Sequence, residues 1–175
     1  MFQRTQRQVE KANPDKHESE RGSSLIEATL IIMLMFGLLF LVIDISLAFF
    51  AKSTLQEAVR EGVRFAVTEQ LASGKSYIND SITQVVQQNS LGMLNGTSGA
   101  CKVSINYYNP ITGAASSGTG GDIIEVSIVG YTYTPVGLLK SANPIPISAT
   151  ASDVMEQCPL GGCPPTTNPT PPTCP

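Results

Sequence analysis

The sequence predicts an α+β protein in which a long N-terminal transmembrane helix leads into a small antiparallel β-sheet domain, followed by a disordered Pro-rich tail. Three observations support this fold class. An apolar run without charges covers residues 28–43, alternating apolar and polar side chains recur after residue 100, and Pro, Thr and Gly dominate residues 158–175. Roughly 20 mostly apolar residues span a bilayer, alternation is typical of half-buried strands, and a proline-rich tail cannot build a core.

Residues 1–22 are expected to form a disordered cytoplasmic leader, because they mix charges of both signs and show no apolar periodicity. Five basic residues precede the apolar run and fewer follow it closely, so the positive-inside rule places the N-terminus in the cytoplasm. A secretory signal has its cleavage site behind the apolar core. Here a small polar junction, Gly22 and Ser23, lies in front of the run, so cleavage there would keep the helix in the mature protein.

One helix is expected over residues 23–73, with the membrane span at about 25–50, because no proline interrupts it and Gly74 supplies a stop. At 1.5 Å per residue such a helix is about 75 Å long, so roughly half of it would project beyond the membrane. Glu27 lies at the start of the apolar run. A carboxylate at the edge of hydrocarbon costs on the order of 2–3 kcal/mol and is therefore a candidate functional residue.

The projecting half of this helix carries a seam of mostly small side chains at three- and four-residue steps, which permits close approach of another helix or a sheet. The seam consists of Ala48, Ala51, Leu55, Ala58, Gly62 and Ala66. Opposite charges three residues apart lie beside it, such as Glu61 and Arg64, and predict a solvated flank. Asp44 allows two interpretations: a carboxylate that reaches the far membrane interface, or a buried carboxylate paired with a neighbouring subunit.

Residues 74–157 are expected to form an extracytoplasmic α+β domain. Residues 77–88 place apolar side chains at helical spacing and predict a second amphipathic helix. Residues 109–122 are rich in Gly, Ser and Thr and predict a loop, without the glycine spacing of a phosphate-binding motif.

Three alternating segments predict the strands of an antiparallel sheet that packs on the projecting half of the long helix. They are residues 102–107, 123–134 and 145–151. The apolar phase of the middle segment changes near Gly130, as a β-bulge requires. Pro144 and Pro146 favour an edge position for the third segment, because proline cannot donate a ladder hydrogen bond.

All four cysteines follow the apolar run, as expected for a segment exported to an oxidising compartment. They are Cys101, Cys158, Cys163 and Cys174. Four cysteines allow three pairings, among which the sequence does not choose, although Cys158 and Cys163 enclose a short loop that could close locally. They lack the closely spaced pairs of zinc sites, so disulfides are favoured over a metal. In the tail, Cys174 is the only expected anchor.

Composition excludes several classes of function. The chain of 175 residues has a net charge of −3 and only 14% charged residues, which leaves no electrostatic basis for binding nucleic acid. The only histidine, His17, lies in the leader, so the exported domain lacks Ser-His-Asp, Cys-His and histidine-metal sites. Gly74-Lys75-Ser76 resembles the end of a P-loop, but Glu69 stands where the leading glycine belongs. We therefore expect no enzyme, no cofactor, no metal and no small-molecule substrate.

The junction of leader and helix resembles the G-x-x-x-x-E processing site of type IV prepilins, since Gly22 is followed by Ser-Ser-Leu-Ile and then Glu27. Residues 49–66 are similar to the aromatic, L-Q-x-A-x-R-x-G-x-R-[YF]-A signature of TadE-like pseudopilins, which belong to the tight-adherence (Tad/Flp) type IV pilus systems. The major pilin of these systems has Tyr after the glutamate. Ala28 stands there in this chain, which favours a minor pilin over the major one.

This resemblance implies a pilin-like fold and a structural role in assembly of a tight-adherence type IV pilus. The implied partners are a prepilin peptidase that cuts between Gly22 and Ser23, other pilin subunits, the inner-membrane pilus assembly platform and membrane lipid. It implies a single-pass protein of the inner membrane with a periplasmic or extracellular C-terminal domain, and a Glu27 that neutralises the new Ser23 ammonium of its own or an adjacent subunit. The alternative is an unprocessed, signal-anchored membrane protein that acts as an extracytoplasmic binding module.

Overall fold

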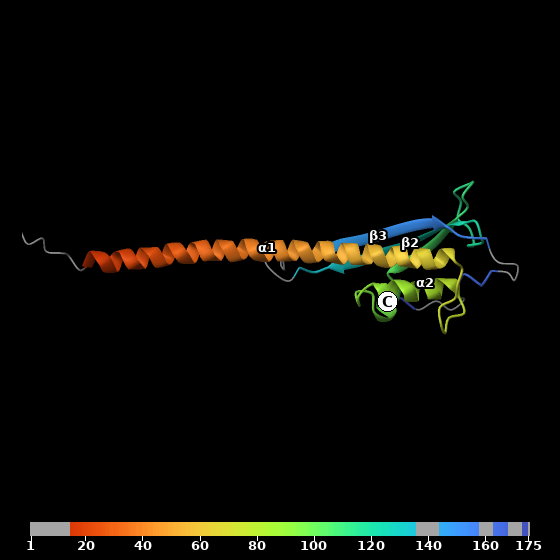
Figure 1. Ribbon diagram of the computed structural model, residues 1–175, viewed down its shortest axis with the longest axis horizontal. Helices are drawn as coiled ribbons and strands as arrows, with labels where there is room; N and C mark the ends of the chain where they lie inside the picture. Colours follow the sequence, from red (N-terminus) through yellow and green to blue (C-terminus); the bar gives the residue numbers. More distant parts are fainter. Residues whose placement is uncertain (1–14, 136–143, 158–162, 168–172, 175) are drawn as a thin grey trace, which may run out of the picture. The chain divides into compact units, whose positions relative to one another are not determined.

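The computed structural model describes residues 15–135, 144–157, 163–167 and 173–174 (Figure 1). The chain divides into two compact units, Met1–Val42 and Ile43–Pro175. The elements are α1 (Asp15–Val67), α2 (Ile78–Asn89), α3 (Gly96–Ala100), β1 (Val103–Tyr108), β2 (Ile123–Tyr133) and β3 (Ile145–Val154). The predicted fold class is confirmed: a long apolar N-terminal helix is followed by a small three-stranded antiparallel sheet.

In the first unit, α1 exposes almost all of its apolar side chains. Met33 is 75% exposed and Leu34 is 77% exposed, and their neighbours along the helix are similar. Within the described residues, Gly22–Val67 is the one helix long and apolar enough to cross a membrane, with a mean hydropathy of 2.8 in its most apolar window. An apolar surface of this size without protein cover is suited to contact with lipid.

Both ends of α1 differ from the predicted 23–73. The helix begins at Asp15, directly after Pro14. No proline lies between Asp15 and Gly22, so nothing in this stretch breaks the helix before the predicted start at residue 23. It ends at Val67, where Glu69 adopts a left-handed backbone (φ 50°) and its N–H donates to the carbonyl of Ala66 at 3.0 Å. The carbonyl of Val67 accepts from the N–H of Glu156 at 3.2 Å, so a distant segment takes the place of the next helical turn.

The sheet has the order β1-β2-β3, with both pairs antiparallel, so β3 occupies the edge position that its prolines predict. Val126 in the central strand lies opposite Ile105 of β1 and Ala151 of β3. The register of β2 and β3 shifts between Ile128 and Tyr131. Gly130 lies there with φ 72°, a conformation that glycine adopts without steric cost. The predicted bulge is therefore confirmed.

The core of the second unit lies where the second part of α1, the helix α2 and the inner face of the sheet meet (Figure 1). Leu55 of α1, Ile82 of α2 and Ile124 of β2 are all fully buried there. Gly62 brings α1 and α2 together, because a Cβ at this position would lie only 2.5 Å from Cγ2 of Val86. The absence of a side chain at Gly62 thus sets how closely the two helices approach.

Gly62→Ala is expected to lower the free energy of unfolding by about 1–2 kcal/mol. Overpacking of this kind costs about 1–3 kcal/mol, and the higher helix propensity of alanine returns up to about 1 kcal/mol. Urea unfolding of the full chain in detergent micelles measures the loss. Gly37→Ala is the matched control in the same helix, because no atom lies within 4 Å of its Cβ position. Equal stability of the two variants would contradict the packing role of Gly62.

Candidate functional site

The residues of the predicted processing site lie on the exposed surface of α1 in the first unit. Gly22, Ser23 and Glu27 are all exposed, and no atom lies within 4 Å of the Cβ position of Gly22. Ser23 and Glu27 are four residues apart on a helix, which places them one turn apart on the same face. A backbone amine created at Ser23 would therefore start the helix within one turn of a carboxylate.

The predicted seam faces the interior of the second unit. Ala51, Leu55, Ala58, Gly62 and Ala66 are buried, and Ala48 is half-buried. The side chains that cover them come from α2 and the sheet of the same chain. In contrast, Arg64 remains exposed and lies 3.9 Å from the Glu61 carboxylate, as a solvated flank would.

Asp44 is only 2% exposed and is buried by the second unit of its own chain. It borders a cavity of about 360 Å³ that is lined by Ala48, Phe49, Pro135 and Ile147, among others. Burial, followed by the charge of Asp44, raises the pKa of Tyr133 above its ordinary value. Asp44 is therefore buried, as one of the two sequence interpretations expects, and pairing with a neighbouring subunit stays a prediction.

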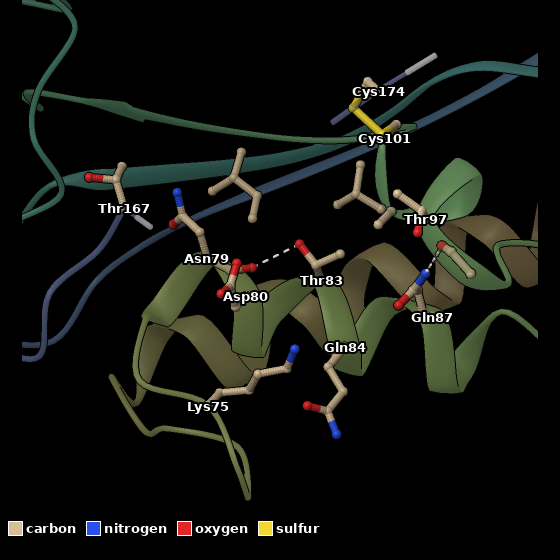
Figure 2. Close-up of a pocket in the computed structure, with 14 residues that line it drawn as sticks. Lys75, Asn79, Asp80, Thr83, Gln84, Gln87, Thr97, Cys101, Thr167 and Cys174 are labelled. Carbon is tan, nitrogen blue, oxygen red and sulfur yellow. Dashed lines mark hydrogen bonds between the residues drawn. A yellow bond between two sulfur atoms is a disulfide. The ribbon is translucent and has the colours of Figure 1, made fainter. Parts of the chain in front are cut away.

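One disulfide joins Cys101, directly after α3, to Cys174 near the end of the chain, across 73 residues of sequence. Cys163 is also disulfide-bonded. Cys158 and the predicted local closure around it lie outside the described residues. Figure 2 shows the Cys101–Cys174 bond at one end of a cavity of about 750 Å³ and Thr167 at the other, with side chains of α2 between them.

The described part of the tail also caps α2. Tyr77 at the start of α2 makes no capping side-chain hydrogen bond. Instead, the N–H groups of Ile78 and Asn79 donate to the carbonyls of Pro165 and Thr166, both at 3.0 Å. These donors would otherwise be unpaired in the first turn of a helix. Cys174 is thus not the only anchor of the tail, contrary to the prediction from sequence.

Several polar side chains around the larger cavity form hydrogen bonds within the fold. The Tyr107 hydroxyl donates to Oδ1 of Asn79 at 2.6 Å. Nε2 of Gln87 donates to the carbonyls of Leu94 and Gly96 at 2.7 and 2.8 Å, and the second of these bonds is drawn in Figure 2. The cavity therefore lies between α2, α3, β1 and the tail, and hydrogen bonds within the chain hold its walls.

Asp122 organises the loop before β2. Its Oδ2 accepts hydrogen bonds from the Ser116 hydroxyl at 2.5 Å and from the Thr119 backbone and hydroxyl at 2.8 and 3.0 Å. The bond from Ser116 is the main reason why the pKa of Asp122 is lowered, and burial opposes the shift. The described residues contain no group of three or more His, Cys, Asp or Glu side chains that could hold a metal ion.

Sequence reasoning missed Glu69, which it considered only as a failed P-loop position. The side chain is buried, and neither carboxylate oxygen has a hydrogen-bond partner within the part of the chain that the structure describes. Glu69 adopts its left-handed backbone just after α1 ends at Val67. The carbonyl of Val67 accepts a hydrogen bond from the N–H of Glu156. No local pattern in the sequence signals that contact.

Comparison with known proteins finds one family. Residues 22–64 match the family model of TadE, described as TadE-like protein. The matched segment begins at the predicted processing glycine and ends in α1, which confirms the resemblance to TadE-like proteins over this part of the chain. No curated protein and no solved structure matches the chain. The family match and the apolar helix together fit a membrane protein related to the Tad pilus.

Proposed function

We propose that this chain, whose residues 22–64 match the TadE-like family, is a minor pilin or pseudopilin of a tight-adherence type IV pilus. The single observation that carries the proposal is the position of that match, which covers the processing glycine, Glu27 and the apolar part of α1. The role is structural and needs no catalytic group, cofactor or substrate. Residues 1–22 form the cytoplasmic leader, and residues 74–157 form the extracytoplasmic domain.

In the first step, a prepilin peptidase cuts between Gly22 and Ser23 and leaves an ammonium on Ser23. The exposed position of both residues supports access by such an enzyme. Glu27 then neutralises the Ser23 ammonium, within the same subunit or from the next one. In low dielectric each lone charge is strongly penalised, and pairing removes most of the penalty, so the pair sets the register of adjacent subunits.

Other pilin subunits and the inner-membrane assembly platform are the proposed partners. The apolar half of α1 remains in the inner membrane or packs against neighbouring subunits, and its uncovered apolar surface supports either contact. The second unit faces the periplasm or the exterior. Its disulfide is consistent with an oxidising compartment.

Gly22→Ala is expected to abolish processing when the chain is expressed together with a prepilin peptidase. The wild-type band on a gel should shift to the mobility of a chain that begins at Ser23, and the variant band should not. Gly37→Ala serves as control, because it changes a glycine of the same helix away from the junction, and should be cut like wild type. Wild type that stays uncut, with Met1 found by N-terminal sequencing, would instead support the signal-anchored binding module.

Glu27→Gln is expected to be processed and membrane-inserted but not assembled into the pilus system. Breaking a buried ion pair costs about 3–5 kcal/mol, which corresponds to a loss of roughly a hundredfold or more in association. Immunoblots of sheared pili and of cross-linked assembly complexes measure incorporation. Glu57→Gln, at an exposed position of α1, is the matched control and should assemble normally. Normal incorporation of Glu27→Gln would remove the ion-pair step from the proposal.

A further inference from the structure

Glu69 is a carboxylate in surroundings that do not suit a negative charge. It follows α1 directly, is 7% exposed, and keeps a left-handed backbone with φ 50°. Both carboxylate oxygens are buried, and no described residue donates a hydrogen bond to either of them. A buried carboxylate normally has a cation or several donors as partners. The arrangement at Glu69 therefore requires another way of avoiding the cost of a buried charge.

The groups that face Glu69 add to this cost. The C-terminal end of α1 carries the negative end of the helix dipole. The segment after β3 contributes the carboxylate of Glu156, which raises the pKa of Glu69 further after the main effect of burial. On β1, burial and then the charge of Glu69 raise the pKa of the Tyr107 phenol, which therefore stays protonated and uncharged. Its hydroxyl already donates to Asn79.

The site also lies at a junction between distant parts of the second unit. The N–H of Glu69 closes the last turn of α1 on the carbonyl of Ala66. The N–H of Glu156 donates to the carbonyl of Val67 and so joins the end of β3 to the end of α1. The Glu69 side chain therefore starts from the same turn that these two hydrogen bonds hold.

We propose that Glu69 is a proton-operated latch, whose neutral carboxyl fits beneath the end of α1 and whose ionised form turns outward to water and loosens the contact between α1 and the end of β3. The neutral form has no charge to desolvate and is not repelled by Glu156. The ionised form gains hydration only by leaving its buried position. The junction is thus tight while Glu69 is protonated and becomes looser as the pH rises past its folded-state pKa.

The direction of the pH dependence follows from the raised pKa of Glu69 in the folded chain. Below the ordinary pKa of 4.5, the carboxyl is protonated in both the folded and the unfolded chain, and the latch contributes fully. As the pH rises above this value the unfolded chain ionises first, so stability falls until the pH has passed the folded-state pKa. Within that window, one pH unit changes the unfolding equilibrium constant by up to about tenfold.

The test is thermal unfolding of the full chain in detergent micelles between pH 4 and pH 8. The unfolding temperature of wild type should fall over the lower part of this range. Glu69→Gln should lack the part of this fall that ionisation of Glu69 causes, and should be at least as stable as wild type at pH 7. Glu57→Gln, an exposed position of α1, controls for general charge effects and should follow wild type. Parallel profiles for wild type and Glu69→Gln would overturn the proposal.

A second measurement does not depend on how the variant folds. Carbon-13 NMR of the Glu69 carboxyl in the wild-type chain should show a titration midpoint above 4.5, and a midpoint at or below 4.5 would overturn the latch.

Two neighbouring carboxylates, here Glu69 and Glu156, can also bind a cation. Repeating the unfolding at pH 7 with millimolar calcium or magnesium tests this alternative. Stabilisation of wild type but not of Glu69→Gln by the cation would show a metal site in place of a latch, and no effect is the expected result.

Discussion

Removing the Cys101–Cys174 disulfide is expected to lower the free energy of unfolding of the second unit by about 2–4 kcal/mol. The bond spans 73 residues, which include the whole sheet, so the unfolded chain gains much conformational freedom when the bond is absent. The double variant Cys101→Ala with Cys174→Ala avoids new free thiols at these positions. Its urea unfolding, compared with wild type in the same detergent, measures the loss.

The same variant should also loosen the start of α2. Pro165 and Thr166 cap this helix from a tail that Cys174 fastens to Cys101, so the amides of Ile78 and Asn79 should exchange faster with solvent in the variant. Thr166→Ala is the matched control. It removes the hydroxyl bond to the Ser117 carbonyl but keeps the disulfide, and should cost only about 0.5–1.5 kcal/mol. Equal unfolding midpoints for the double variant and wild type would contradict the stabilising role of the bond.

Gly99→Ala is expected to cost about 3 kcal/mol or more, at the upper end of overpacking changes. A Cβ at this position would lie 2.1 Å from both the carbonyl carbon and the carbonyl oxygen of Leu94. These are backbone atoms, so no side-chain rotation relieves the overlap. Leu94 is itself fully buried, and its carbonyl accepts from Gln87, so a shift of this segment disturbs the core and α2 together.

Thermal unfolding of Gly99→Ala and of Thr97→Ala separates this overlap from a general effect on α3. Thr97 lies in the same short helix but is exposed, and its truncation should change the unfolding temperature little. If both variants unfold at the wild-type temperature, then α3 moves freely enough to accept a methyl group, and the close contact of Gly99 with Leu94 is not important for stability.

The elements that were predicted correctly are those whose pattern is local. The apolar run at 28–43 is continuous, and the alternation in the three strands has a period of two residues, so both can be recognised from neighbouring residues alone. The phase change near Gly130 identified the bulge, because a shift of one residue turns every following side chain to the opposite face. The junction at Gly22 lies within the segment that matches the TadE-like family, and so does the signature at 49–66 apart from its last two residues.

The features that could not be predicted depend on contacts between distant residues. The local sequence predicted that the long helix ends at Gly74, but it ends at Val67. There the N–H of Glu156 donates to the Val67 carbonyl, which a further helical turn would otherwise use. The sequence did not choose among the three pairings of the four cysteines, and the folded chain joins Cys101 to Cys174. No feature of the sequence near Tyr77 indicates that carbonyl groups of the tail cap the N-terminus of α2.

The sequence thus determined the apolar helix, the three strands and the similarity to TadE-like proteins, because each of these can be recognised within one continuous stretch of residues. Only the tertiary structure decided which groups are buried together. Glu69 is ordinary in the sequence, and its carboxylate becomes exceptional only because the fold buries it and brings Glu156 to the end of α1. Burial and the loss of hydrogen-bond partners are properties of the packed chain, because they depend on what other segments bring to the same place.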